Sequence, residues 1–200
     1  MSDRTRYRRF RIRLSVPLLA AVALCAGCPI SHSDRPIDPE TVILNFAKVS
    51  DSLYRGGHPS AEGFAKLKSL GVRTVVSLRT FNVHRSRLEG LGLGYVHISF
   101  KAGNAEDEDV VRFLKVMETS ANHPVFVHCK WGTDRSGLMA AAYRMVVEGW
   151  PRERAIAEMR AMGYDQDKWP QMRDYLERLD VAALQQKVRG ADPPEIVVIR

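Results

Sequence analysis

The sequence is poor in cysteine, and its few cysteines are unevenly placed. Of the three in 200 residues, Cys25 and Cys28 lie near the N-terminus, so the rest of the chain has a single thiol, Cys129. That count excludes a fold held together by disulfides within this part of the chain. A lone cysteine is either a buried structural residue or a reactive one, and its neighbours decide between the two.

The sequence also lacks an apolar run long enough for a permanent membrane span. Its longest candidate, residues 14–27, falls short of the ~20 residues that a transmembrane helix needs. An arginine-rich segment precedes this run and small residues follow it, which together predict a secretory signal over residues 1–28. The exit, Leu24-Cys25-Ala26-Gly27-Cys28, resembles a bacterial lipobox and implies lipidation of Cys28. Cleavage without lipidation and a permanent signal anchor are the alternatives.

From this segment we expect an exported protein, either periplasmic or a membrane-anchored lipoprotein of the bacterial envelope. Membrane association would then depend on the lipid anchor. Residues 29–40 contain three prolines among polar residues and are predicted to be a flexible tether.

A concentrated basic stripe is missing as well. The formal net charge is +7, but six arginines against one aspartate give residues 1–27 a charge of +5, which leaves only about +2 for the remainder. The positive charge therefore belongs to the targeting segment, and nucleic acid is excluded as the expected partner. There are no internal repeats.

The stretch 125–137 contains the strongest chemical signal. It reads V-F-V-H-C-K-W-G-T-D-R-S-G: an apolar strand, a short polar loop, and then the start of an alanine-rich helix. Such a strand–loop–helix unit forms an anion site, because loop N–H groups and the helix dipole converge on one point. The same field lowers the pKa of Cys129, and Arg135 can grip two phosphoryl oxygens with its planar fork. Ser136 can donate its hydroxyl to the sulfur. Together these groups predict nucleophilic attack on phosphorus and a phosphocysteine intermediate.

The motif His128-Cys129-x5-Arg135-Ser136-Gly137 resembles the signature loop of the cysteine-based protein tyrosine phosphatase superfamily. The loop has Lys130 directly after the cysteine and Asp134 directly before the arginine. This variant resembles the atypical dual-specificity branch of the superfamily, the small phosphatases of plants, fungi and bacteria. The resemblance covers residues 45–179. It is also carried by four phrases: Asn45-Phe46-Ala47, Leu53 to Pro59, Leu70 to Arg79, and Asn122-His123-Pro124.

The alternation of strands and helices predicts a single α/β domain over residues 41–187, with a central, mainly parallel sheet flanked by helices on both faces. The resemblance implies the same phosphatase fold. Predicted strands are Phe46–Val49 and Leu53–Arg55, both as edge strands, Thr74–Leu78, Tyr95–Ser99 and Val125–Val127. We expect Ser60 to cap one helix that ends at Gly71, and Asn104 to cap another. Further predicted helices span Asn82–Leu91, follow the signature loop from Arg135, begin at Pro151, and span Trp169–Lys187. Residues 188–200 form a tail that either pairs at a sheet edge or stays loose.

The resemblance implies a role for each residue of the loop. Cys129 is the expected nucleophile, Arg135 clamps phosphate, Ser136 assists the sulfur, and His128 supports the environment of the cysteine. Residues 130–135 cradle the phosphate: Lys130, Trp131, Gly132, Thr133, Asp134 and Arg135. No metal or other cofactor is expected.

The identity of the general acid stays open. Many relatives place an aspartate on a loop before the helix that precedes the signature strand, where this chain has Asp107 and Asp109. Both also suit a helix N-terminus as dipole-compensating charges. The alternative is Asp134, inside the signature loop itself, and we favour it over Asp107.

Three functions remain in view. The first, which we favour, is a protein phosphatase of phosphotyrosine or of dual specificity, and the alternative is a phosphatase of inositol phosphates or phosphoinositides. The third is an inactive phosphate-binding module, against which the intact pair of Cys129 and Arg135 argues. The expected partner is a phosphorylated protein or a small phosphorylated molecule, and the sequence does not indicate an oligomeric state.

Overall fold

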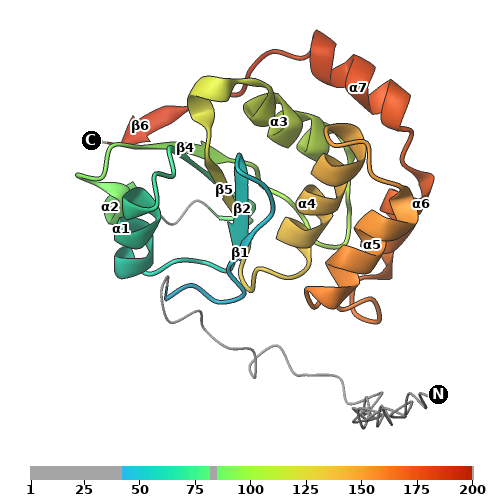
Figure 1. Ribbon diagram of the computed structural model, residues 1–200, viewed down its shortest axis with the longest axis horizontal. Helices are drawn as coiled ribbons and strands as arrows, with labels where there is room; N and C mark the ends of the chain where they lie inside the picture. The colour runs from blue at the N-terminus through green and yellow to red at the C-terminus, as the bar shows by residue number, and fades with distance from the viewer. Residues whose placement is uncertain (1–41, 82–84, 200) are drawn as a thin grey trace, which may run out of the picture. The chain divides into compact units, whose positions relative to one another are not determined.

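The computed structural model describes residues 42–81 and 85–199, and within them six strands form one mixed sheet (Figure 1). The strands are β1 (Ala47–Lys48), β2 (Leu53–Gly56), β3 (Thr74–Ser77), β4 (Leu93–His97), β5 (Val125–His128) and β6 (Val197–Ile199). The helices are α1 (Ala61–Ser69), α2 (Arg85–Leu88), α3 (Asp107–Glu118), α4 (Arg135–Val146), α5 (Arg152–Ala161), α6 (Pro170–Arg178) and α7 (Val181–Gly190), with a 3-10 turn at Ser120–Asn122. The predicted signal, the tether and Cys28 lie outside the described residues, as do residues 82–84 of the predicted helix Asn82–Leu91.

The sheet has the order β1-β2-β5-β3-β4-β6. The neighbours β2, β5, β3 and β4 pair in parallel, whereas β1 and β6 pair antiparallel at the two edges. The mainly parallel α/β sheet is therefore confirmed. Because Gly56 and Ser77 both lie in register with His128, the carboxyl ends of β2, β3 and β5 lie side by side. The carboxyl ends of parallel strands are where open α/β sheets place their ligands.

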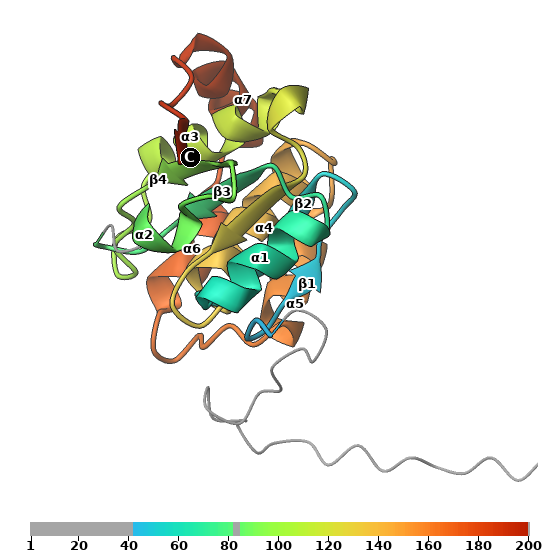
Figure 2. The ribbon, with the colours of Figure 1, turned by 90° about the vertical axis from the view of Figure 1, so that its left-hand side faces the viewer.

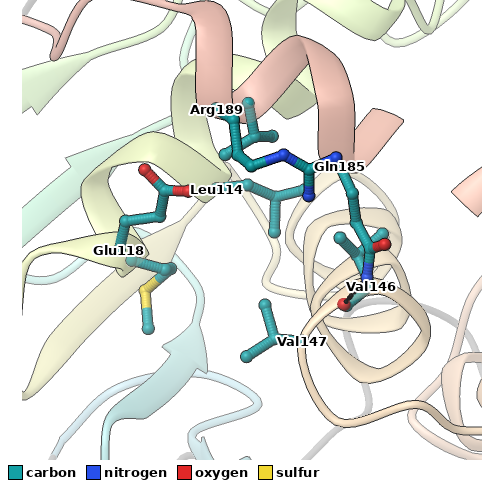
Figure 3. A pocket seen from close by; sticks show the side chains of 8 residues that line it. Leu114, Glu118, Val146, Val147, Gln185 and Arg189 are labelled. Atoms are coloured by element: carbon teal, nitrogen blue, oxygen red, sulfur yellow. Dashed lines mark hydrogen bonds between the residues drawn. The ribbon is translucent and has the colours of Figure 1, made fainter. Parts of the chain in front are cut away.

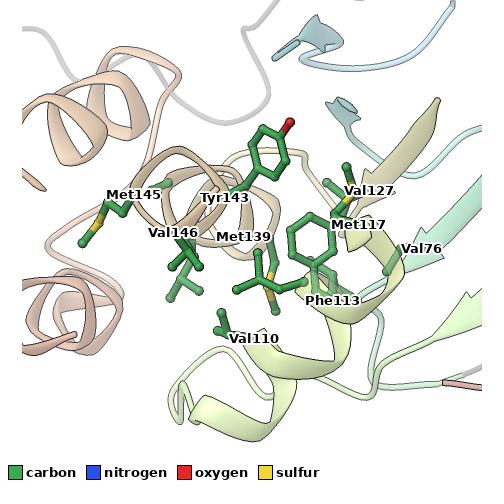
Figure 4. Close-up of a cluster of buried hydrophobic side chains, with 14 of the residues drawn as sticks. Val76, Val110, Phe113, Met117, Val127, Met139, Tyr143, Met145 and Val146 are labelled. Atoms are coloured by element: carbon green, nitrogen blue, oxygen red, sulfur yellow. The ribbon is translucent and has the colours of Figure 1, made fainter. Parts of the chain in front are cut away.

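Helices cover both faces of this sheet (Figures 1 and 2). The helices α1 and α2 pack on one face, against a core that includes Val75 and Phe126. The larger core lies on the other face, where α3 and α4 pack against Val76 and Val127 (Figure 4). Successive residues of β3 and β5 thus serve opposite cores, as expected for buried strands of a parallel sheet.

The helix α1 confirms two local predictions, whereas the predictions for Asn104 and for the strand at Leu53 are wrong. Ser60 caps α1 by accepting a hydrogen bond from the Gly63 N–H at 3.1 Å, and Gly71 follows the helix with a φ of +82°. Asn104, however, does not cap α3. Its side-chain amide donates to the Glu106 carboxylate, and the helix begins at Asp107 without a side-chain cap. The strand at Leu53 also differs from the prediction, because β1 covers it and makes β2 an interior strand.

The predicted helix Trp169–Lys187 is wrong as a single element. The chain leaves helical geometry at Leu179, and Asp180 then caps α7 by accepting from the Ala183 N–H at 2.9 Å. An aspartate offers its own backbone an alternative to the continuing helix, which is why the chain breaks there. The folded structure continues beyond residue 187. In the predicted tail, Val197–Ile199 pair with β4, which confirms the edge pairing that we left open.

Candidate active site

The carboxyl end of β5 leads directly into the signature loop. The strand ends at His128 and α4 begins at Arg135, so Cys129 to Asp134 span the turn between them. The Cys129 side chain is only 2% exposed. A buried strand and a buried helix thus fix both ends of the loop, which places the thiol at the floor of the sheet's ligand-binding edge.

Each backbone carbonyl of the loop from Cys129 to Thr133 accepts a hydrogen bond from a group around its outside. The donors are His128 Nδ1 to the Cys129 oxygen (3.2 Å), His58 N to Lys130 (3.2 Å), Asn45 Nδ2 to Trp131 (2.7 Å), and Arg55 Nη2 to Gly132 (2.9 Å) and Thr133 (3.0 Å). With their carbonyls held outward, the peptide units can turn N–H groups inward. One of them, the Gly132 N–H, donates to Cys129 Sγ at 3.2 Å. This arrangement is an anion-binding nest.

Arg55 is a supporting residue that our sequence analysis did not identify. It is only 2% exposed, and its guanidinium reaches the loop past Gly137, where a Cβ would lie 3.1 Å from Nη2. The loop also needs glycine at position 132, which has a φ of +81° and would place a Cβ 2.3 Å from the Gly57 nitrogen. A signal for Arg55 was present in the sequence. Arg55 lies two residues after buried Leu53 on β2 and therefore points to the same buried face, where a charge is tolerated only if it is paired.

The electrostatics of the loop favour a thiolate. Burial raises the pKa of Cys129, but the charge of Arg135, the N–H and hydroxyl of Ser136 and the Gly132 N–H outweigh this effect. The net pKa of the thiol is therefore below its usual range. The Ser136 hydroxyl, itself fully buried, lies 3.6 Å from Sγ.

Arg135 is tied to the scaffold at one end of its fork. Its Nη1 donates to the carbonyl oxygens of Leu78 at 3.0 Å and Phe100 at 3.5 Å, beyond the ends of β3 and β4. A guanidinium has five N–H donors, so Nε and Nη2 still have donors for an oxyanion. Three parallel strands thus cooperate in placing one arginine.

A cavity of about 210 Å³ opens above the thiol. The signature loop supplies most of its wall through Cys129, Lys130, Trp131, Asp134 and Arg135, with Ala102, Lys168 and Trp169 completing it. Lys130 is exposed and lies 4.7 Å from the centre of the Trp131 ring. Our sequence analysis did not identify Lys168 and Trp169 as cavity residues, because the loop between α5 and α6 carries no motif that indicates an active site.

Asp134 is the only acidic residue in the described lining of this cavity. Its carboxylate accepts hydrogen bonds from the Thr133 hydroxyl and from the Asp165 N–H, both at 3.0 Å. Its side chain therefore joins the signature loop to the loop that precedes α6. Asp134 is thus a carboxyl group held by two hydrogen bonds in the wall of the same cavity as Cys129, which makes it a candidate general acid.

Asp107 and Asp109 lie elsewhere. Asp107 accepts hydrogen bonds from Tyr175 and Lys187, and the Lys187 ammonium holds the pKa of Asp107 below its usual range. Burial, reinforced by Glu106, raises the pKa of Asp109 to about 6, but neither aspartate lines the cavity of Cys129. This placement favours Asp134 over both.

His128, whose Nδ1 donates to the Cys129 carbonyl, is fully buried, and its ring stacks on that of His58 with centroids 5.7 Å apart. Burial, followed by the charges of Arg79 and Arg87, lowers the pKa of His58 to about 4. His58 is therefore neutral near pH 7, and Arg87 Nη1 donates to its Nε2 at 3.1 Å.

Two other cavities lack a nucleophile. One of about 350 Å³ lies between α3, α4 and α7, where apolar side chains such as Leu114 and Val146 meet Gln185 and Arg189 (Figure 3). Another, of about 410 Å³, is lined by Asp107 and Tyr175. Within residues 42–81 and 85–199 no cluster of three potential metal-ligating side chains is present. The same ranges contain no helix that is long and apolar enough to span a bilayer.

The family follows from the match to a family model. The model described as PTP-NADK, a DSP-PTPase phosphatase fused to NAD+ kinase, matches residues 40–174. Since these residues are more than half of the chain and include the entire loop, the chain belongs to the cysteine-dependent dual-specificity phosphatases. It is a phosphatase of that type.

Particular relatives narrow the comparison. The dual specificity protein phosphatase TpbA of Pseudomonas aeruginosa is 34% identical over 84% of this chain and 81% of its own length. Inositol diphosphatase DSP3 of Arabidopsis thaliana is 30% identical over 71% of this chain and 73% of its own. The structure of a cysteine-to-serine variant of TpbA with phosphotyrosine superposes with a TM-score of 0.67 and 30% identity, covering 78% of this chain and 96% of that one.

Proposed function

We propose that this phosphatase hydrolyses phosphotyrosine in proteins through a phosphocysteine intermediate on Cys129. The observation that carries the proposal is the nest itself, in which a buried, low-pKa thiol lies beneath a loop whose carbonyls are held outward. Support for the substrate comes from similarity to TpbA, which has been crystallised with phosphotyrosine. Two tryptophans in the cavity wall also suit an aryl phosphate.

In the first step the Cys129 thiolate attacks phosphorus. The S–P bond forms while the P–O bond to the leaving group breaks, and Arg135 and the loop N–H groups balance the charge on the three equatorial oxygens. Asp134 gives its proton to the departing phenolate or alkoxide oxygen.

In the second step water attacks the phosphocysteine. Asp134, now ionised, takes a proton from the water as the O–P bond forms and the S–P bond breaks. The Ser136 hydroxyl, 3.6 Å from Sγ, donates to the leaving sulfur and stabilises the thiolate that returns. Phosphate then leaves, and the cycle has consumed one water.

The second candidate is an inositol phosphate phosphatase. Lys130 and Lys168 both line the cavity and could hold phosphates other than the one being cleaved. The relative from A. thaliana is named as an inositol diphosphatase, which favours the same alternative.

An assay panel distinguishes the two substrate classes. We expect the highest kcat/KM with a phosphotyrosine peptide, lower values with phosphoserine and phosphothreonine peptides, and the lowest with inositol polyphosphates. The measurement is phosphate release under initial-rate conditions, with a Cys129→Ser preparation as the blank. A kcat/KM for an inositol polyphosphate above that for every phosphopeptide would replace our proposal with the second candidate.

Asp134→Asn tests the general acid without disturbing the loop. The asparagine oxygen can still accept from the Asp165 N–H, and its amide can donate to the Thr133 hydroxyl, so both contacts survive. We expect kcat for a phosphotyrosine peptide to fall by ~10²-fold or more, and the basic limb of its pH–rate profile to flatten. A good leaving group needs little protonation, so p-nitrophenyl phosphate should be much less affected.

Asp107→Asn is the matched control for this experiment. It removes an exposed ion pair with Lys187, which contributes ~1 kcal/mol at most to the free energy of unfolding. Any change in kcat should therefore be the same for every substrate. If the leaving-group dependence appears in Asp107→Asn and is missing from Asp134→Asn, the acid assignment is wrong.

We further propose that the enzyme acts outside the cytoplasm as a lipoprotein anchored through Cys28. The support is the arginine-rich and apolar N-terminal segment with its small-residue exit. Labelled palmitate should be incorporated by the wild-type protein and lost in Cys28→Ala, with Cys25→Ala as the control that keeps the label. Equal labelling of wild type and Cys28→Ala, or none in either, would contradict lipidation at this residue.

A further inference from the structure

The cavity has a second wall that lies outside the signature loop. Lys168 and Trp169, from the loop between α5 and α6, line it together with Cys129. We call residues 163–169 the recognition loop. In the proposed reaction the phosphoryl group lies in the signature loop and the leaving group lies opposite the attacking sulfur, which directs it away from Cys129 toward the rest of the wall.

The recognition loop is fixed by its own hydrogen bonds. The Asp165 N–H donates to Asp134 at 3.0 Å, and the Asp165 carboxylate accepts from the Lys168 N–H, also at 3.0 Å. The Trp169 N–H donates to the Asp165 carbonyl at 3.0 Å, while the Tyr164 hydroxyl donates to the Trp169 carbonyl. Trp169 is thus placed relative to Cys129 through Asp134, in a preformed geometry.

The two tryptophans of the wall come from different loops. Trp131 belongs to the signature loop, and Trp169 is half-buried, with its ring 4.0 Å from the position of a Cβ built on Gly103. Each indole has a lysine over it, Lys130 at 4.7 Å and Lys168 at 5.7 Å from the ring centre. The wall therefore combines two aromatic rings with two positive charges, which fits an aromatic ring with acidic neighbours.

We propose that Trp169 is a specificity-determining residue, the surface against which the aromatic ring of the leaving group packs, and that Lys168 beside it favours acidic residues flanking the phosphotyrosine. This assignment rests on the proposed function, since it presumes a peptide substrate. The ring contact exists before and during P–O cleavage. Its loss therefore raises KM and leaves kcat nearly unchanged.

Trp169→Ala tests the ring contact. We expect kcat/KM for a phosphotyrosine peptide to fall about tenfold through KM, equivalent to ~1.4 kcal/mol, with little change for a phosphoserine peptide. Trp169→Phe should restore most of the loss. Inhibition by vanadate, which needs only the signature loop, should stay within about twofold of wild type in both variants.

Trp150→Ala is the matched control. Its indole packs between Arg144 and Arg154, at 4.0 and 3.5 Å from the ring centre, and it does not line the cavity. The control should leave the ratio of phosphotyrosine to phosphoserine activity unchanged. If Trp169→Ala lowers kcat/KM equally for the phosphotyrosine and phosphoserine peptides, or weakens inhibition by vanadate in proportion, the proposal is overturned in favour of a structural role.

Lys168→Met tests the charge. In wild type we expect a higher kcat/KM for a peptide with glutamate next to phosphotyrosine than for one with lysine there. The variant should lower this ratio about threefold, and added salt should reduce the gap between wild type and variant. An unchanged preference would overturn the role of Lys168.

Failure of the proposed function has a different signature from failure of this inference. If wild type does not cleave phosphotyrosine peptides at all, the protein-substrate proposal is wrong, whatever Trp169 does. In that case p-nitrophenyl phosphate and glycerol phosphate replace the peptides. A selective rise in the aryl phosphate's KM in Trp169→Ala would support the ring contact, and equal effects on both would overturn it.

Discussion

Cys129→Ser should bind phosphate and vanadate but release no product. The serine hydroxyl occupies the place of Sγ, yet its proton is held far too tightly for it to act as an oxyanion near pH 7. We expect turnover to fall by at least ~10⁴-fold, or ~5.5 kcal/mol at the transition state. The anion site is expected to survive, because Arg135 and the loop carbonyls are held by groups other than the sulfur, and a serine oxygen can still accept from the Gly132 N–H.

Removal of the thiolate also removes a negative charge from beneath a dianionic ligand. Phosphate should therefore bind the serine variant as tightly as wild type or more tightly, which isothermal titration can measure. A serine variant that keeps measurable turnover would exclude the thiolate mechanism, and one that loses phosphate binding as well would indicate a collapsed loop.

The lowered pKa of Cys129 can be tested separately, through the pH dependence of its alkylation in the wild-type protein. A lowered pKa means that the thiolate persists below the ordinary thiol value of ~8.5 and is lost only as the pH falls through the folded-state pKa. Iodoacetate should accordingly alkylate Cys129 in the wild-type protein at a pH below the ordinary thiol value, where unperturbed thiols react slowly, and phosphate should protect it. Mass spectrometry of the peptide that contains Cys129 separates this thiol from Cys25 and Cys28.

The strand–loop–helix unit at Cys129 was predictable because its signals are local. An apolar strand, a polar turn and an alanine-rich helix follow one another within the stretch 125–137, and the chemistry of Cys129 and Arg135 depends on that order. The alternation of such units along the chain predicted the parallel centre of the sheet in the same way. These features need no information about distant parts of the chain.

The walls and supports of the site depend on distant parts and were missed for that reason. Arg55 holds carbonyls of the loop because β2 lies beside β5, and Asn45 reaches the loop from the turn before β1. Neither neighbourhood can be read from the sequence of the segments themselves. Lys168 and Trp169 reach the cavity because Asp134 holds the Asp165 N–H, a contact between loops separated by α4 and α5. The break at Leu179 is different, because its signal is local. Asp180 is a typical helix-capping residue, and we nevertheless predicted a single helix through it.

Arg135→Lys should lose ~10²-fold or more in kcat, ~3 kcal/mol, although it conserves the charge. The structure supplies the reason. Nη1 of Arg135 is occupied by the carbonyls of Leu78 and Phe100, so the arginine can hold the scaffold with one nitrogen and bind phosphoryl oxygens with the others. A lysine has a single nitrogen and a shorter reach. It must either leave the scaffold or leave the substrate.

Arg152→Lys is the control, because Arg152 also donates to a backbone carbonyl, that of Leu179 at 2.6 Å, but does not line the cavity. It should keep wild-type kcat with at most a small change in thermal stability. For Arg135→Lys we expect kcat and kcat/KM to fall together, since the fork binds the equatorial oxygens more strongly in the transition state than in the substrate. An Arg135→Lys enzyme that keeps most of its kcat would show that charge alone suffices, and the assignment of Arg135 as a bidentate clamp would then be wrong.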